Sequence, residues 1–172
     1  ELSRLQSGTA SLSRSVFAPL PLFNLIHETY SAYAEDYQQT FVYDVPEDLP
    51  SVWGNPDRTQ QVLIVLLDNA FKYTPEGGRL PPRAGGDVVR VRVCDTGVGI
   101  PAADLPHVFD RFYKVDKSHH SKGTGLGLAI AYEIMKHLGE EMSVTSEPGQ
   151  GSCFTFTLHI AQGAAELPKA PA

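Results

Sequence analysis

A helix start signal ahead of a long apolar segment constrains the fold of this chain more than any other feature. Asn55 is a residue type that caps helices, Pro56 suits the first helical position, and Asp57 places an acid in the first turn. The strongly apolar sequence that follows continues to about Lys72. The pattern therefore predicts a helix from Pro56 to about Lys72.

Several other segments have the alternation, or the β-branched and aromatic content, of strands. These predicted strands are residues 15–17, 40–43, 87–95, 141–146 and 152–158. Further helices are predicted at residues 22–39, 105–109 and 126–137. Because the strands mostly neighbour each other as hairpins, with helices between them, we expect an α+β fold. It would be a two-layer sandwich of a mixed, mostly antiparallel sheet packed against helices.

Composition sets the scale and excludes some function classes. With 172 residues, 42% of them hydrophobic, the chain suits one domain. A formal net charge of −6 disfavours a general nucleic-acid binder. No run approaches the roughly 18 apolar residues of a membrane span. We expect residues 1–8 to end a helix that begins before Glu1, residues 9–162 to form the domain, and residues 163–172 to be a disordered tail.

The two cysteines, Cys94 and Cys153, lie in separate apolar alternating segments. In such segments a small buried thiol is expected, rather than a disulfide or a metal ligand. Free thiols imply a reducing setting, so we expect a cytoplasmic domain. A membrane anchor elsewhere in the parent chain stays open.

The end of the helix predicted up to Lys72 carries polar residues on one side. Asn69, Lys72 and Tyr73 lie three and four residues apart. Asn69 offers a neutral oxygen to a hard cation, Lys72 a positive charge to phosphate, and Tyr73 an aromatic plane to a base. Alternatively, Asn69 and Lys72 form a solvated face and Tyr73 belongs to the core.

Asp95 ends a predicted strand and precedes two glycines, Gly97 and Gly99, and then Ile100. The glycines let the backbone turn tightly beside a planar ring. A carboxylate at the strand end can accept a hydrogen bond from the exocyclic amine of adenine. The alternative is an ordinary Asp-x-Gly turn.

A second glycine segment lies directly ahead of the predicted helix at residues 126–137. Its residues are Gly123, Thr124, Gly125, Leu126 and Gly127. Backbone N–H groups and the positive end of the helix dipole can bind phosphate there. No strand directly precedes the segment, which argues against a dinucleotide-binding motif, and no Gly-Lys-Ser/Thr phosphate loop is present. A helix start without a ligand is the alternative.

Taken in order, these segments resemble the catalytic and ATP-binding domain of sensor histidine kinases over nearly the whole chain. The similar segments are the N box at Asn69, Lys72 and Tyr73, the first glycine box at 95–99, the F box at 109–113, the second glycine box at 123–127 and the closing hairpin at 147–156. Four ordered boxes are a specific signal. The resemblance implies a Bergerat-type ATP-binding fold.

The resemblance also implies a role for each site residue. Asn69 would coordinate Mg²⁺, Lys72 would contact phosphate, and both would be catalytic. Tyr73 would pack on the purine, Asp95 would accept from the adenine amino group, and Ser152 would join through water. The remaining nucleotide contacts are expected from Gly97, Gly99, Ile100, Arg111, Lys114, Gly123, Thr124, Gly125, Leu126 and Gly127.

Between the F box and the second glycine box the resemblance implies an ATP lid, at about residues 104–123. Phe109 and Phe112 would anchor it. Arg111, Lys114 and Lys122 are its candidate phosphate cations.

The chain departs from the family pattern in three places, and one of them is the stretch between Gly78 and Val88, which looks shorter than the pattern. Val65 stands where the N box usually carries an additional asparagine, so one contact to phosphate or metal is expected to be missing. Glu140 replaces a common glycine, without consequence for the chemistry.

His27, followed by Glu28 and Thr29, matches the family's acceptor box poorly. We therefore expect the acceptor histidine before Glu1.

The sequence thus predicts a protein-histidine kinase domain that uses ATP and Mg²⁺. Its expected partners are upstream dimerisation helices carrying the acceptor histidine, and a response regulator. The parent would be a homodimer and the isolated domain a monomer. Alternatives are a related ATPase or protein-serine kinase of the same superfold, or a nucleotide-sensing module without transfer, which Val65 keeps open.

Overall fold

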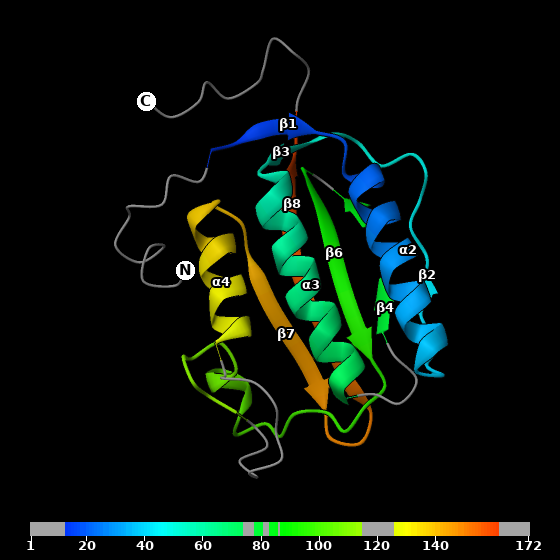
Figure 1. Cartoon of the computed structure of the whole chain (residues 1–172). Coiled ribbons are helices and arrows are strands. Elements are labelled where there is room, and N and C mark those ends of the chain that lie inside the picture. Colours follow the sequence, from blue (N-terminus) through cyan, green and yellow to red (C-terminus); the bar gives the residue numbers. More distant parts are fainter. Residues whose placement is uncertain (1–12, 74–77, 81–82, 86, 115–125, 162–172) are drawn as a thin grey trace.

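The computed structural model describes residues 13–73, 78–80, 83–85, 87–114 and 126–161, and these form two layers (Figure 1). One layer is an eight-stranded sheet. Its strands are β1 Ser15–Phe17, β2 Val42–Tyr43, β3 Val52–Gly54, β4 Gly78–Leu80, β5 Arg83–Gly85, β6 Val88–Asp95, β7 Met142–Glu147 and β8 Gly151–Ile160. The helices α2 Pro19–Asp36, α3 Pro56–Tyr73 and α4 Gly127–His137 cover one face of the sheet, and a short 3-10 helix, η1 Leu105–His107, lies near α4. The expected helix end at residues 1–8 and the tail at 163–172 lie outside the described residues.

The sheet is mixed and mostly antiparallel. Its strand order is β1-β3-β8-β6-β4-β2, with β5 paired to β6 and β7 paired to β8. Among the described strands, only the β2–β4 pair is parallel. β6 runs along one side of β8, and β7 and β3 share its other side. The predicted α+β sandwich is confirmed.

α3 lies over the centre of the sheet (Figure 1). The Arg58 backbone N–H donates to Asn55 Oδ1 over 3.0 Å, so the predicted N-cap is confirmed. The buried side chains of α3 recur every three or four residues, as a helix against a sheet requires: Val62, Leu63, Leu66, Leu67 and Ala70. In the sheet, the core is formed by Val89, Val91, Val93, Phe154, Phe156 and Leu158. None of the helices in the described part of the chain has the length and hydropathy needed to span a membrane.

Parts of the sheet differ from the sequence-based expectation. β3 is only three residues long, and so short a segment carries no recognisable alternation. β4 ends at Leu80 and β5 begins at Arg83, so Pro81 and Pro82 lie between two short strands in the sequence. The prolines themselves lie outside the described residues, and each flank contributes three residues that pair with other strands.

The cysteines correct an expectation. Cys94 and Cys153 are joined by a disulfide and their Cα atoms are 4.1 Å apart. They lie directly opposite each other in the antiparallel β6–β8 pair. The expectation of two free buried thiols is wrong, because sequence patterns place each cysteine in a strand without showing which residue of a distant strand will face it. The inference of a reducing compartment from free thiols thereby loses its premise.

Candidate functional site

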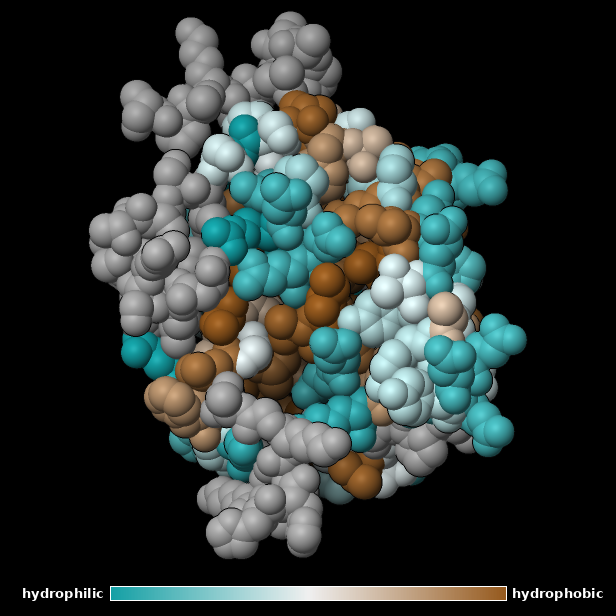
Figure 2. All heavy atoms as spheres, in the orientation of Figure 1, coloured by the Kyte–Doolittle hydropathy of each residue, from teal (hydrophilic) through white to brown (hydrophobic). Residues whose placement is uncertain are grey.

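Three of the predicted site segments meet at one end of the molecule. α3 ends, β6 ends at Asp95, and α4 begins at Gly127, all at the lower end of Figure 1. α3 and α4 lie side by side, since a Cβ atom added to Gly127 would be 3.5 Å from Cγ1 of Val65. Figure 2 shows apolar side chains gathered between these two helices. The site therefore lies where polar element ends border the apolar core.

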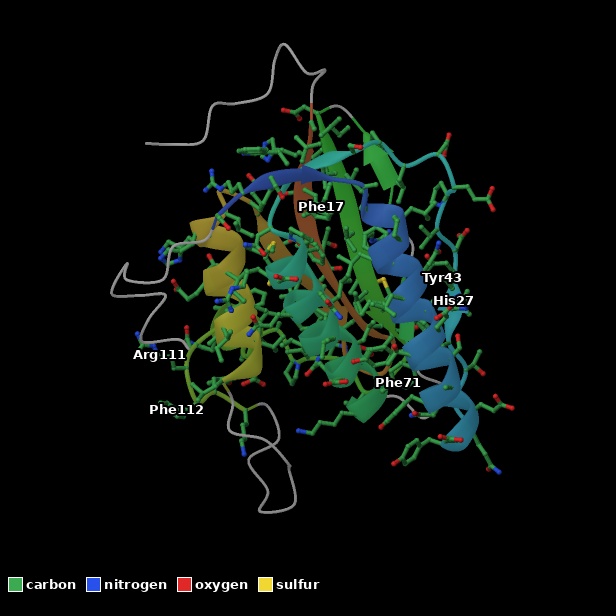
Figure 3. All side chains as sticks on the ribbon, turned by 45° about the horizontal axis from the view of Figure 1, so that its top comes forward. Phe17, His27, Tyr43, Phe71, Arg111 and Phe112 are labelled. Atoms are coloured by element: carbon green, nitrogen blue, oxygen red, sulfur yellow. A yellow bond between two sulfur atoms is a disulfide. The ribbon has the colours of Figure 1, made fainter. Side chains whose placement is uncertain are left out.

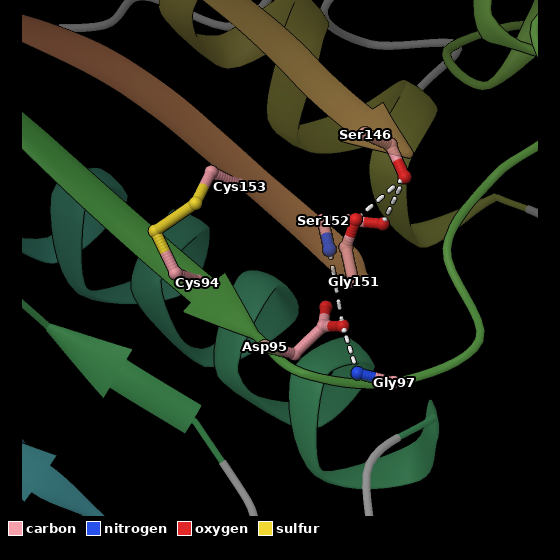
Figure 4. The surroundings of a disulfide bond; sticks show 7 residues. All are labelled: Cys94, Asp95, Gly97, Ser146, Gly151, Ser152 and Cys153. Atoms are coloured by element: carbon pink, nitrogen blue, oxygen red, sulfur yellow. Dashed lines mark hydrogen bonds between the residues drawn. A yellow bond between two sulfur atoms is a disulfide. The ribbon is translucent and has the colours of Figure 1, made fainter. Parts of the chain in front are cut away.

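Asp95 is the charged residue most closely held at this end. It is 9% exposed, and its Oδ1 accepts hydrogen bonds from the backbone N–H groups of Gly97, at 3.0 Å, and Ser152, at 3.3 Å (Figure 4). Oδ2 receives no hydrogen bond from the described residues. Two donors on one oxygen hold the carboxylate in place, so the second oxygen can accept from a ligand.

The glycine segment after Asp95 is tied to the hairpin of β7 and β8. The Ile100 N–H donates to Ser146 Oγ at 2.7 Å, and the Gly149 N–H donates to the Val98 carbonyl at 2.8 Å. Gly99 has a φ of +74°, and a Cβ atom there would collide with the backbone of Glu147. The segment is therefore fixed in shape by residues about fifty positions later.

Ser146 is a site residue that the sequence reasoning missed. Besides accepting from Ile100, its hydroxyl is 2.9 Å from the Gly151 carbonyl and 2.7 Å from Ser152 Oγ (Figure 4). It thus links the glycine segment to the start of β8. No local pattern distinguishes Ser146 from Ser143, the other serine of β7, because its role depends on strand pairing.

One face of α3 carries the two residues that the sequence predicts to bind metal and phosphate. Val65, Asn69 and Lys72 share this face, at positions i, i+4 and i+7. The half-buried amide of Asn69 has no hydrogen-bond partner among the described residues, which fits a group kept for a ligand. Lys72 is exposed. Tyr73 ends the helix, and its side chain lies outside the described part of the chain.

The predicted lid is described only at its start. Phe109 stacks on Tyr132, with ring centroids 4.8 Å apart, and meets the edge of Phe154 at 6.1 Å, so it anchors this segment as expected. Phe112 is 67% exposed with a φ of +63°, and the expectation that it is a second anchor is wrong. Figure 3 shows Phe112 and Arg111 at the periphery.

The remaining predicted lid and phosphate residues are only partly described. Lys114 is half-buried, and Tyr113 donates a hydrogen bond to Asp104, which raises the pKa of the tyrosine. Leu126 caps α4 and Gly127 begins it. The predicted contacts at Lys122, Gly123, Thr124 and Gly125 lie outside the described residues.

His27 is not part of this site. Its ring stacks on Tyr43 with centroids 4.1 Å apart and planes 5° from parallel (Figure 3). A packing role for this histidine agrees with its poor match to an acceptor box.

Among the described residues, no cluster of three or more His, Cys, Asp or Glu could hold a metal ion.

A family model for the histidine kinase-, DNA gyrase B- and HSP90-like ATPases matches residues 54–162. This match covers more than half of the chain and every described site residue. The chain belongs to this ATPase family. The predicted resemblance to histidine kinase ATP-binding domains is confirmed by relatives as well as by the family.

Two curated relatives are sensor kinases. The chain is 43% identical over 129 residues to the adaptive-response sensory kinase SasA of Thermosynechococcus vestitus, covering 73% of this chain and 34% of the relative. It is 37% identical over 164 residues to the sensor histidine kinase RcsC of Escherichia coli K12, covering 93% of this chain and 17% of that protein. The chain thus spans about a third or less of these relatives.

Solved structures share the fold. Full-length ShkA in complex with AMPPNP superposes with a TM-score of 0.82 at 29% identity, covering 94% of this chain and 35% of that one. The catalytic domain of histidine kinase ThkA superposes with a TM-score of 0.75 at 24% identity, covering 87% of this chain and 97% of that one. The similarity to the ThkA domain supports the fold alone. Together they confirm the predicted fold class.

Proposed function

We propose that this chain binds ATP with Mg²⁺ and donates the γ-phosphoryl group to a histidine on helices outside this sequence. The observation that carries the proposal is Asp95. Its buried carboxylate has one oxygen held by two N–H groups and the other without a partner among the described residues. The family match and the sensor-kinase relatives support the same function.

Asp95 selects the base. Oδ2 accepts a hydrogen bond from the exocyclic amine of adenine, while guanine carries a carbonyl oxygen at that position. A carboxylate facing that oxygen would lose its hydrogen bond and gain repulsion, so guanine is disfavoured. Ser152, 6% exposed, joins this contact through water. Gly97, Gly99 and Ile100 border the ring, and Tyr73 packs on the purine.

The phosphates lie toward α4 and the lid. Lys72, Arg111 and Lys114 supply positive charge from α3 and from the segment after η1. Backbone N–H groups at the start of α4, at Leu126 and Gly127, add the positive end of a helix of 11 residues. Gly123, Thr124 and Gly125 precede them in the sequence and extend the same binding segment.

Asn69 is the protein ligand of Mg²⁺. A single neutral oxygen suffices because Mg²⁺ commonly takes its other ligands from substrate phosphates and water. When bound, the cation offsets the negative charge of the phosphates. Asn69 and Lys72, one turn apart on α3, hold the triphosphate in a fixed position from one side.

In the transfer step, an imidazole nitrogen of the acceptor histidine attacks the γ-phosphorus in line with the bond to the β-phosphate oxygen. The P–N bond forms, the P–O bond breaks, ADP leaves with the electron pair, and the imidazole releases its other proton. The residues of this chain position the phosphate and neutralise charge, which provide most of the acceleration in phosphoryl transfer.

The partners follow from this chemistry. Upstream dimerisation helices carry the acceptor, a response regulator receives the phosphoryl group, and the parent protein is a homodimer, with this domain alone a monomer. We place the domain in the cytoplasm, where ATP is available, and leave any membrane anchor to the rest of the parent chain.

A nucleotide-sensing module without transfer is the second candidate, and Val65 favours it. Val65 lies against the start of α4 and brings no polar atom to the phosphate end. A related ATPase or protein-serine kinase is less well supported, because those proteins usually lack the Phe-Asp-Arg-Phe-Tyr sequence found at residues 109–113.

Mixing the domain with a separate protein carrying the upstream helices of the parent, Mg²⁺ and γ-labelled ATP tests the proposal. Acid-labile, base-stable label on the helices is the expected result. Good ATP binding without label on the helices would instead establish the sensing module. Label on serine, which is acid-stable, would identify the protein-serine kinase.

A further inference from the structure

The disulfide lies next to two residues of the proposed base site. Cys94 directly precedes Asp95 on β6, and Ser152 directly precedes Cys153 on β8 (Figure 4). Cys94 and Cys153 are also the last residue pair in the register of these two strands. The disulfide therefore closes the strand pair at the point where the site begins.

The disulfide and the site lie on opposite faces of the sheet. Asp95 and Ser152 are buried toward the helices, and side chains alternate along a strand. Cys94 and Cys153 therefore face the side that no described helix covers, and both are half-buried. A thiol reagent can approach from this side without entering the nucleotide site.

Beyond the disulfide, few contacts join the two strands. The Ser152 N–H donates to Asp95 Oδ1 at 3.3 Å, a long hydrogen bond. Gly151, with a φ of +110°, lies so close to the Asp95 backbone that a Cβ atom could not fit. This close approach depends on the spacing of the two strands, and the disulfide is the covalent link between them, at the last pair of their ladder.

We propose that Cys94 and Cys153 are a thiol–disulfide modification site through which a dithiol reductant lowers the affinity of the domain for ATP. The disulfide form keeps Asp95 and Ser152 together. The dithiol form lets the strand ends separate and disorders the carboxylate. This inference rests on the proposed nucleotide site.

Thiol–disulfide exchange between the protein and a dithiol reductant proceeds in two steps. A thiolate of the reductant attacks one cysteine sulfur, forming a mixed disulfide and releasing the other cysteine as a thiolate, which takes up a proton. The second thiol of the reductant, as its thiolate, then attacks the mixed disulfide, releases the second cysteine thiol and closes the reductant's own disulfide. Two electrons and two protons pass to the protein.

Coupling between two sites is reciprocal for binding free energies. If the disulfide strengthens ATP binding, ATP must stabilise the disulfide against reduction by the same factor. A link that only stabilises the fold, without influencing the site, would show neither effect. The reciprocal shift is therefore the distinguishing measurement.

The first measurement is calorimetric titration of MgATP into the oxidised 172-residue chain and into the chain reduced with dithiothreitol. We expect reduction to weaken binding by about five- to tenfold. The second is the equilibrium constant for reduction in mixtures of reduced and oxidised dithiothreitol. Saturating MgATP is expected to shift it toward the disulfide by the same factor.

The double variant Cys94→Ser, Cys153→Ser is the matched control. It should bind MgATP like the reduced chain in both buffers. Equal affinity of the oxidised and reduced wild-type chains overturns the inference and leaves the nucleotide site intact. Absence of MgATP binding in both states overturns the proposed function as well. Loss of the circular dichroism signal on reduction overturns the redox inference, because the disulfide would then be required for folding.

Discussion

The two ends of the proposed nucleotide site are built in different ways. At the base end, Asp95 and Ser152 are 9% and 6% exposed, and the adjoining glycine segment is bonded to the β7–β8 hairpin. At the phosphate end, Lys72 and Arg111 are exposed, and Phe112 is 67% exposed. The base end is organised before ligand binds, whereas the phosphate end consists of side chains on separate elements. Single substitutions should therefore cost more at the base end.

The largest effect is expected from Asp95→Asn. The amide retains the size but replaces a carboxylate oxygen by an N–H₂ group, which would face either the Gly97 and Ser152 donors or the adenine amine. We expect a loss of about 3 kcal/mol in ATP binding, or roughly 150-fold, measured by calorimetry. Asp87→Asn, an exposed change just before the other end of β6, is the control. An affinity within a factor of two of wild type would remove Asp95 from the base site.

Asn69→Ala tests the phosphate end at a half-buried polar side chain. Loss of the amide oxygen should abolish the part of ATP binding that depends on Mg²⁺, about tenfold or more in affinity. Binding is measured with Mg²⁺ and with a chelator. Asn24→Ala on α2 is the control, since among the described residues the Asn24 side chain bonds only Tyr43. Should the Mg²⁺ dependence persist in Asn69→Ala, the metal ligand lies elsewhere.

The two phenylalanines of the F box give a matched pair within the lid region. Phe109→Ala should lower the free energy of unfolding by about 2 kcal/mol, because it empties the contact with Tyr132 and Phe154. Phe112→Ala should change it by less than about 0.5 kcal/mol, as expected of an exposed residue. Urea unfolding of both variants measures the difference. Equal losses would show that Phe112 is buried in solution.

The main elements and most of the candidate site could be predicted because their signals are local. Asn55 caps α3 as its sequence context indicates, and Asp95 lies at the end of β6, where alternation stops. What could not be predicted depends on pairing between distant residues. Ser146 acts through the β7–β8 register, and the Cys94 to Cys153 link spans 59 positions.

The F box shows a different reason for error. Phe109 and Phe112 are three residues apart, a spacing that would place both on one side of a helix. The described segment is not a regular helix there, and Phe112 has a positive φ and is 67% exposed. A motif records which residues recur in a family, but it does not record which of them face the core.

Val65→Asn tests whether the phosphate end can be improved, and its effect should be the smallest. The valine lies against the start of α4, so an amide there could donate to phosphate or accept from the first N–H groups of the helix. We expect MgATP affinity to rise about threefold, a gain of roughly 0.6 kcal/mol, which is typical of one added hydrogen bond. Stability should fall by about 1 kcal/mol, because a polar group replaces an apolar one that packs against the core. Val42→Asn, at an exposed position on β2, controls for the general cost of replacing valine by asparagine. If Val65→Asn weakened ATP binding, then the apolar contact between α3 and α4 would itself hold the phosphate end together, and the contrast between a preorganised base end and a loosely built phosphate end would be smaller than we infer.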